Sequence, residues 1–196
     1  MNPVKSVFTP IASTVGPADV EPAVAALVLA FSADPVTRWT YPDPGQYLAM
    51  FPTLVRAFGG GAFTHGSARQ VGNHAGVALW LPPGIEPDQA ALEASLPAGR
   101  EGEFSGVFEA MASYHPHEDH WYLPLIGVDP VHQGKGCGAA LLDDVLSQCD
   151  RDHVAAYLES TNPANLTLYQ RHGFKLQGTI QAGSSPPLFP MFRPAR

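Results

Sequence analysis

The spacing of apolar and polar residues predicts two helices in the first third of the chain. The first follows Asp19, which is placed to cap it, and ends at Asp34-Pro35. The second begins at Asp43-Pro44 and stops at the three glycines of residues 59–61. Apolar steps of three and four residues put Leu48 among the buried positions of this second helix. Each helix therefore presents one apolar face to the core.

Strand and helix patterns follow each other along the rest of the chain. Short apolar runs bounded by Gly, Pro or Asn predict strands, and steps of three and four residues predict helices. The predicted strands are residues 7–15, 63–65, 76–81, 121–128, 154–159, 174–180 and 188–193. The predicted helices of this part are residues 88–95, 104–114, a segment ending at about residue 150, and 163–172.

Size and composition indicate one domain. The 196 residues, of which 45% are hydrophobic, are enough to bury one substantial core, so we expect residues 1–196 to form a single domain. Cys137 and Cys149 would lie about 18 Å apart on one helix, which is too far for a disulfide. Two unpaired cysteines suit a reducing compartment.

The charge balance argues against nucleic-acid and membrane partners. The net charge is -7, and the 11 Lys and Arg residues are scattered rather than clustered. The longest apolar run, residues 23–31, is shorter than the roughly 20 residues that span a bilayer. Asp19 and Glu21 stand where a signal peptide would carry positive charge. We therefore expect a cytoplasmic protein.

The most informative stretch is the glycine-rich loop of residues 133–138, which lies between a predicted strand and a predicted helix. Free backbone N–H groups and the helix dipole at such a position bind anions, and glycine lets a phosphate approach the amides. The ATP-binding pattern Gly-x-x-x-x-Gly-Lys-[Ser/Thr] fails because Gly136 follows Lys135. The loop therefore predicts a phosphate site of another class.

A dinucleotide site is one alternative for this loop. Gly134, Gly136 and Ala139 match G-x-G-x-x-[G/A], and Glu159 follows at about the 20-residue distance of a ribose-binding acid. However, residues 129–132 separate the strand from the loop, whereas the dinucleotide turn starts at the strand end. The dinucleotide reading is thus the weaker one.

The same residues carry a family resemblance. Read as Gln133-x-x-Gly136-x-Gly138, the loop resembles the acetyl-CoA-binding motif of the GCN5-related N-acetyltransferases. Residues 159–174 are similar to that family's second motif, and the resemblance covers roughly residues 120–181. It implies an α/β fold of the α+β type: a mixed, V-shaped, mostly antiparallel sheet flanked by helices, known as the acyl-CoA N-acyltransferase fold. Pro124 fits, because a bulge or a splayed strand edge accommodates proline.

The resemblance implies acetyl-CoA as cosubstrate and a small-molecule amine as acceptor. The residues implied to hold the coenzyme are Leu125, Ile126, Val128, Gln133, Gly134, Lys135, Gly136, Cys137, Gly138, Asn165, Tyr169 and Arg171. Asn162 is explained as a helix N-cap, and His172 as a residue favoured at a helix C-terminus.

Acetyl transfer to an amine needs a base for the ammonium and an acid for the departing thiolate. Tyr169 suits the acid, because a phenol with a reference pKa of about 10 stays protonated at neutral pH. Base candidates are Glu118, His120 and Glu159, and a chain of water molecules is a further alternative. The histidines of residues 115–120 match no metal signature, so no metal is expected.

The acceptor pocket and the overall function remain open to alternatives. Candidate pocket residues, for each of which core packing is an equal explanation, are Arg38, Trp39, Tyr41, Trp80 and Trp121. A non-catalytic coenzyme-A-binding sensor and an NAD-dependent oxidoreductase are the rival functions. The sequence does not reveal the oligomeric state, and a homodimer is implied only by its frequency in the family.

Overall fold

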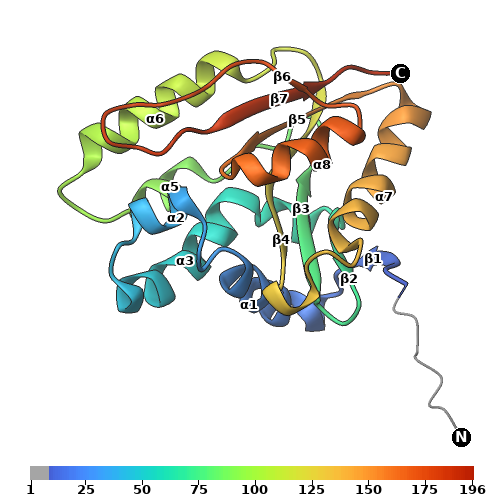
Figure 1. The fold of residues 1–196 in the computed structure, drawn as a ribbon, viewed down its shortest axis with the longest axis horizontal. Coiled ribbons are helices and arrows are strands. Elements are labelled where there is room, and N and C mark those ends of the chain that lie inside the picture. Colours follow the sequence, from blue (N-terminus) through green and yellow to red (C-terminus); the bar gives the residue numbers. More distant parts are fainter. Residues whose placement is uncertain (1–8) are drawn as a thin grey trace, which may run out of the picture.

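The computed structural model describes residues 9–196, which form one seven-stranded sheet with helices on both faces (Figure 1). The strand order is β1-β2-β3-β4-β5-β7-β6, and every neighbouring pair is antiparallel except β4 and β5, which are parallel. The strands are β1 (Ala12–Thr14), β2 (Ala68–Val71), β3 (Gly76–Leu81), β4 (His120–Val128), β5 (Ala155–Ser160), β6 (Lys175–Leu176) and β7 (Phe189–Arg193). The predicted mixed, mostly antiparallel sheet is confirmed.

The helices are α1 (Val20–Ala30), α2 (Pro35–Thr40), α3 (Pro44–Gly59), α4 (Gly61–Thr64), α5 (Gln89–Ala94), α6 (Glu101–Tyr114), α7 (Cys137–Asp152) and α8 (Leu166–Arg171). Helices α1–α4 lie between β1 and β2, and α5 and α6 lie between β3 and β4. Single helices, α7 and α8, follow β4 and β5. Three short 3₁₀ helices are η1 (Pro17–Asp19), η2 (Pro130–His132) and η3 (Pro163–Asn165). Among the helices of residues 9–196, none is long and apolar enough to cross a membrane.

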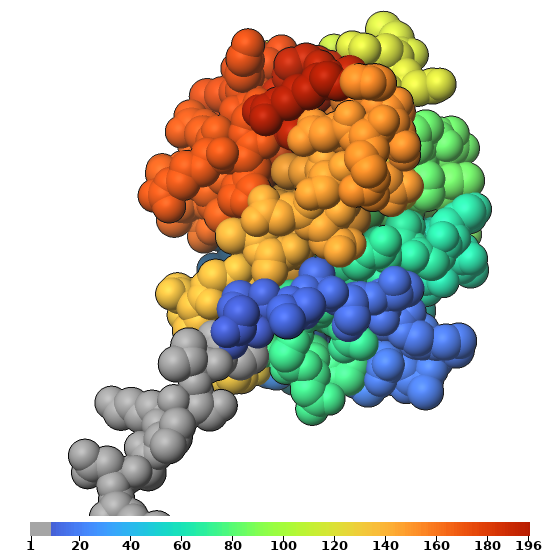
Figure 2. All heavy atoms as spheres, turned by 90° about the vertical axis from the view of Figure 1, so that its right-hand side faces the viewer, coloured from blue at the N-terminus to red at the C-terminus, as the bar shows by residue number. Residues whose placement is uncertain are grey.

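The two faces of the sheet bury two separate cores. One core packs α1 and α3 against Leu79, Leu81 and Tyr122, and the other packs α7 against Trp80 and Trp121. On the side of the molecule shown in Figure 2, α7 lies between the first strand below it and the C-terminal segment above it. Cys137 and Cys149 are both free and buried on α7, in agreement with the prediction for this pair.

Pro124 lies at a break in the register of β4. Leu79 pairs with Leu125 but Leu81 pairs with Tyr122, so β4 has one residue more than β3 over this stretch. The extra residue inverts the alternation of faces: Tyr122 and Leu125, three positions apart, both belong to the α1–α3 core. Of the two alternatives for Pro124, a bulge or a splayed edge, the register shift shows a bulge.

Several predicted boundaries were wrong. Residues 63–65 are not a strand, because α4 starts directly after Gly60, whose backbone is helical, and Ala62 is buried. Leu48 is 62% exposed although the helical pattern placed it in the core. Asp19 makes no side-chain capping bond, whereas Asp34, taken as a helix stop, caps α2. The predicted first strand began at residue 7; residues 7 and 8 lie outside the described part, and β1 begins at Ala12.

Candidate active site

The site begins where β4 and β5 separate. The two strands pair only from His120 opposite Ala155 to Tyr122 opposite Tyr157, although β4 continues to Val128. From Leu123 onward, no strand of the described part of the chain therefore lies beside the edge of β4 that would face β5. This separation is the V-shaped opening that the resemblance implied, and it leaves backbone N–H and C=O groups of β4 available to a ligand.

A cavity of about 830 Å³ runs through this opening. Its lining combines the β4 segment Leu123–Val128, the β5 end Leu158–Ser160, and the loop before α7. Further lining residues come from α2, α3, α5 and α6, which lie to the left of β4 and β5 in Figure 1, while α7 lies to the right. The cavity thus joins a loop of phosphate-binding type to an apolar region on the other side of the strand opening.

The glycine-rich loop forms one end of the cavity. Gly134 and Gly136 have φ values of +72° and +85°, a left-handed conformation that favours glycine. Gly136 caps the 16-residue α7, and Gly138 lines the cavity in the first turn. The N–H groups of such a first turn have no partner within the helix and carry the positive end of its dipole. This end of the cavity can therefore bind an anionic group.

The segment after β5 supplies a second wall. Asn162, Asn165 and Tyr169 line the cavity, and Tyr169 is only 4% exposed. Burial, reinforced by the nearby carboxylate of Asp34, raises the pKa of the Tyr169 hydroxyl well above that of an ordinary tyrosine. Tyr169 therefore remains a protonated donor at neutral pH.

Glu159 lines the cavity two residues after Tyr157, which makes the last pairing of β5 with β4. Its Oε2 accepts a hydrogen bond of 2.9 Å from Tyr122 Oη, and its Oε1 is buried with no hydrogen-bond partner among the described residues. Burial raises the pKa of Glu159 to about 7, although the nearby Tyr122 and Tyr157 hydroxyls oppose part of this rise. Glu159 is thus a carboxyl group that can gain and lose a proton near neutral pH.

Comparison with known proteins decides the family. The sequence model of the acetyltransferase (GNAT) family matches residues 68–174, which is more than half of the chain. The chain belongs to the GNAT family. The alternative of a dinucleotide fold is therefore wrong, and the sheet agrees, because within residues 9–196 its only parallel pair is β4 with β5.

Individual relatives support the assignment of this chain to the GNAT family. An uncharacterized N-acetyltransferase of Schizosaccharomyces pombe is 29% identical over 184 residues, which cover 83% of this chain and 73% of that protein. A Corynebacterium glutamicum protein, described as histone acetyltransferase HPA2 and related acetyltransferase, is 26% identical with a TM-score of 0.71, and the match covers 96% and 98% of the two chains. The Drosophila melanogaster polyamine N-acetyltransferase shares the fold at 16% identity, with a TM-score of 0.67 and coverage of 94% and 98%.

Most of the predicted coenzyme residues of the GNAT protein line the large cavity. They are Leu125, Ile126, Val128, Gln133, Gly134, Gly136, Cys137, Gly138, Asn165, Tyr169 and Arg171. Lys135 does not, because its Nζ donates to Val131 O at 2.8 Å on the exposed side of the loop. Asn162 accepts from Ala164 N, as expected of a helix cap. His172 bonds Leu168 O and contacts the carboxylate of Asp143, so its contacts are those of a helix C-terminus.

The three base candidates are divided between two cavities. Glu159 lines the large one, whereas Glu118 and His120 line a separate cavity of about 160 Å³. In that second cavity His120 Nε2 lies 3.1 Å from His115 Nε2, and burial together with the charge of His120 lowers the pKa of His115. No group of three or more His, Cys, Asp or Glu side chains within residues 9–196 is arranged to hold a metal ion.

The candidate acceptor residues are also divided. Trp39 and Tyr41 line the large cavity, and Tyr41 Oη donates to Ser95 O at 2.8 Å. Arg38, Trp80 and Trp121 do not reach it, which corrects their predicted place in the acceptor pocket. Arg38 turns back to Pro42 O, and both tryptophans point to the opposite face of the sheet, against α7.

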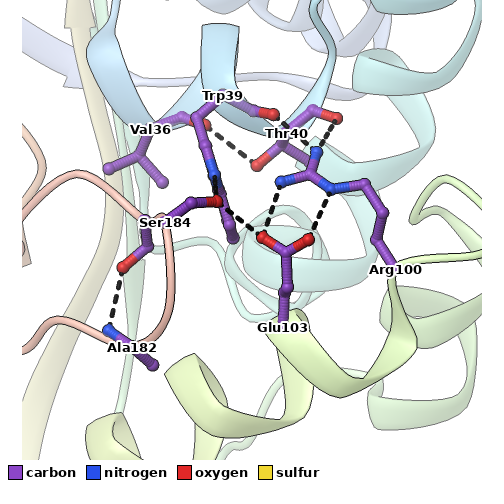
Figure 3. Close-up of polar contacts among 8 residues, drawn as sticks. Val36, Trp39, Thr40, Arg100, Glu103, Ala182 and Ser184 are labelled. Carbon is purple, nitrogen blue, oxygen red and sulfur yellow. Dashed lines mark hydrogen bonds and ion pairs between the residues drawn. The ribbon is translucent and has the colours of Figure 1, made fainter.

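Sequence reasoning missed the groups that support Trp39. In Figure 3, Trp39 Nε1 donates to Ser184 Oγ at 3.0 Å, and Ser184 Oγ donates to Glu103 at 2.7 Å. Arg100 places its guanidinium 4.4 Å from the Trp39 ring centroid, donates to Trp39 O at 2.7 Å and pairs with Glu103 at 3.3 Å. We call these four residues the Trp39 clamp. No spacing signal could have revealed it, because Ser184 lies on a loop far along the chain from the other three.

Proposed function

We propose that the protein transfers the acetyl group of acetyl-CoA directly to the primary amine of a small molecule. The observation that carries this proposal is one continuous cavity that contains the glycine-rich loop, the open edge of β4, and the side chains of Glu159 and Tyr169. An acyl donor and an amine entering from opposite ends would meet at the strand opening. Proximity in such a site accounts for a large part of the rate enhancement.

The loop fits the pyrophosphate of coenzyme A. Left-handed Gly134 and Gly136 turn the backbone without a side chain in the way, and a Cβ built at Gly138 would lie 3.2 Å from Leu168 Cδ2. The backbone N–H groups of residues 133–138 hold the pyrophosphate in this proposal, and Arg171 adds charge beside them. The open edge of β4 from Leu125 to Val128 holds the pantetheine arm by backbone hydrogen bonds.

The chain supplies an acid and a base at the strand opening. Glu159 first accepts one proton from the ammonium, and the neutral amine nitrogen then bonds to the acetyl carbon. Tyr169 donates a proton to sulfur as the carbon–sulfur bond breaks, and the nitrogen gives its second proton to the Tyr169 oxygen through solvent. Glu159 releases its proton to solvent, so the ammonium and acetyl-CoA yield the acetylated amine, free coenzyme A and one proton without a covalent enzyme intermediate.

Release of free thiol from acetyl-CoA, measured across a panel of primary amines, tests the activity. Acetyl-CoA binding followed by thermal shift separates two failures, because ligand at 100 times its Kd stabilises the fold by roughly 2.7 kcal/mol. Binding without thiol release on any amine favours the non-catalytic sensor. Thiol release with at least one amine rejects it.

Replacement of Tyr169 by Phe tests the acid. We expect Tyr169→Phe to bind acetyl-CoA with unchanged Kd and to lower kcat by about 100-fold or more, the range of a lost general acid. Tyr114→Phe is a matched control, because Tyr114 ends α6 outside the cavity lining. Equal kcat values for the two variants would reject the role of Tyr169.

A further inference from the structure

The far end of the large cavity, on the side of α5 and α6, is apolar. Among the described residues, those that line the cavity from α2, α3, α5 and α6 carry no charged side chain. The α6 contribution consists of Phe104, Val107, Phe108 and Met111. An acceptor that extends from the strand opening into this end would bury its distal part against aromatic and aliphatic groups.

Carboxylates are scarce along the whole cavity. Of the described lining residues, only Asp34 and Glu159 are acidic. Both oxygens of Asp34 are already used, because Oδ1 accepts from Thr37 N at 2.9 Å and Oδ2 accepts from Thr161 Oγ1. Glu159 Oε1 has no hydrogen-bond partner among the described residues. The cavity can therefore compensate one ammonium group, and that group lies at Glu159.

The Trp39 clamp makes the far end unfavourable for a second cation. The guanidinium of Arg100 lies 4.4 Å from the Trp39 ring centroid and 5.1 Å from that of Phe104, and both rings line the cavity. The nearby carboxylate of Glu103 is occupied by Arg100 and Ser184, as Figure 3 shows. A distal ammonium would thus lose water without meeting a free carboxylate, because Glu103 is already paired with Arg100.

We infer that the acceptor is a monoamine with an uncharged apolar group, alkyl or aryl, rather than a diamine or polyamine. Its ammonium lies at Glu159, and its apolar group lies against the cavity wall that the Trp39 ring and the α6 side chains form together. This inference rests on the proposed acetyl transfer and specifies its substrate class. Trp39 is the specificity-determining residue, and Arg100, Glu103 and Ser184 position it.

Two amines with the same carbon chain give the sharpest test. Hexylamine and hexamethylenediamine differ only in the second ammonium, so the ratio of their kcat/KM values isolates its effect. At saturating acetyl-CoA we expect hexylamine and phenethylamine to exceed hexamethylenediamine and spermidine by about tenfold or more in kcat/KM. Equal or greater kcat/KM for the diamine would overturn this inference alone. Absence of thiol release with every amine, despite acetyl-CoA binding, would overturn the proposed function as well.

Substitutions in the far end test the location. Met111→Glu adds a carboxylate at a partly buried lining position, and it should raise kcat/KM for hexamethylenediamine about tenfold while lowering that for hexylamine. Leu48→Glu adds the same charge at a 62% exposed position outside the lining and should leave the ratio unchanged. A diamine gain in both variants, or in neither, would contradict the location.

The role of Trp39 is tested by measuring KM and kcat separately in Trp39 variants. Trp39→Ala should raise KM for phenethylamine about tenfold with a smaller change in kcat, because the ring contributes binding rather than chemistry. Trp39→Phe should restore most of this loss. A fall in kcat without a change in KM, or no recovery with Phe, would reject Trp39 as a specificity determinant.

Discussion

Glu159 shows how burial prepares one side chain for proton transfer. Its carboxyl group lies at the strand opening, and burial raises its pKa to about 7. A base must be deprotonated to act, so the active fraction of Glu159 falls as the pH drops below about 7. The rise in pKa also brings Glu159 closer to the pKa of an ammonium, which makes proton transfer to it less unfavourable.

We expect Glu159→Gln to lower kcat by about 100-fold or more and to remove the loss of kcat/KM below about pH 7. The measurement is a pH profile of kcat/KM for wild type and variant with one amine, so that the ionisation of the amine is common to both. Glu118→Gln is the matched control, because Glu118 lines the separate smaller cavity. A large loss in the Glu118 variant with normal activity in the Glu159 variant would reverse the assignment.

The sequence identified candidate side chains, but it could not show toward which face of the sheet each one points. Glu159 and Tyr169 were identified from spacing and resemblance, and both line the cavity. Trp80 and Trp121 were equally conspicuous as aromatic residues, but they occupy strand positions that point to the α7 face. Both faces of this sheet are apolar, so the pattern could not show which face opens onto the cavity.

Among the elements, the loop and α7 were the most predictable and the segment after α3 the least. The sequence shows glycines directly before a helical spacing of apolar residues, which is a clear local signal. In the structure these glycines have positive φ and precede the 16-residue α7. The glycines of residues 59–61 suggested an end of helical structure, yet α4 follows at once, and Thr64 and His65 bond back to Gly61 O. Tertiary packing of Ala62 decides this segment, and local propensity does not reveal it.

Gly138 allows the loop and α7 to be tested together. Gly138→Ala should weaken acetyl-CoA binding by about tenfold, because the new methyl group occupies the cavity wall and presses on Leu168, 3.2 Å away. The stability of the free protein should not fall, since alanine favours a helix by about 1 kcal/mol over glycine. Gly102→Ala is the control, because Gly102 lies in the first turn of α6 with no atom within 4 Å of the added Cβ. Unchanged acetyl-CoA affinity in the Gly138 variant would contradict the proposed coenzyme site.

The cavity forms the candidate active site, and it also lowers the stability of the whole molecule. One sheet runs from Ala12 to Arg193, and the opening between β4 and β5 interrupts its hydrogen bonding at the centre. Glu159 is held in that opening at a folded pKa of about 7, against an ordinary value of 4.5. A carboxyl group whose pKa is raised on folding stabilises the fold below about pH 4.5, and it loses this contribution as the pH rises through 7.

The resulting prediction is that Glu159→Gln makes the protein more stable while it lowers activity. The difference between the two pKa values corresponds to about 3 kcal/mol at about pH 8, where wild-type Glu159 is ionised, and to less than about 1 kcal/mol at about pH 5. Urea unfolding at both pH values measures the difference in the free energy of unfolding between variant and wild type. Glu118→Gln, at an exposed position, should show no such pH-dependent gain. A Glu159 variant that is no more stable than wild type at about pH 8 would mean that the carboxylate is compensated when ionised, and the shift that makes Glu159 a base near neutral pH would then be absent.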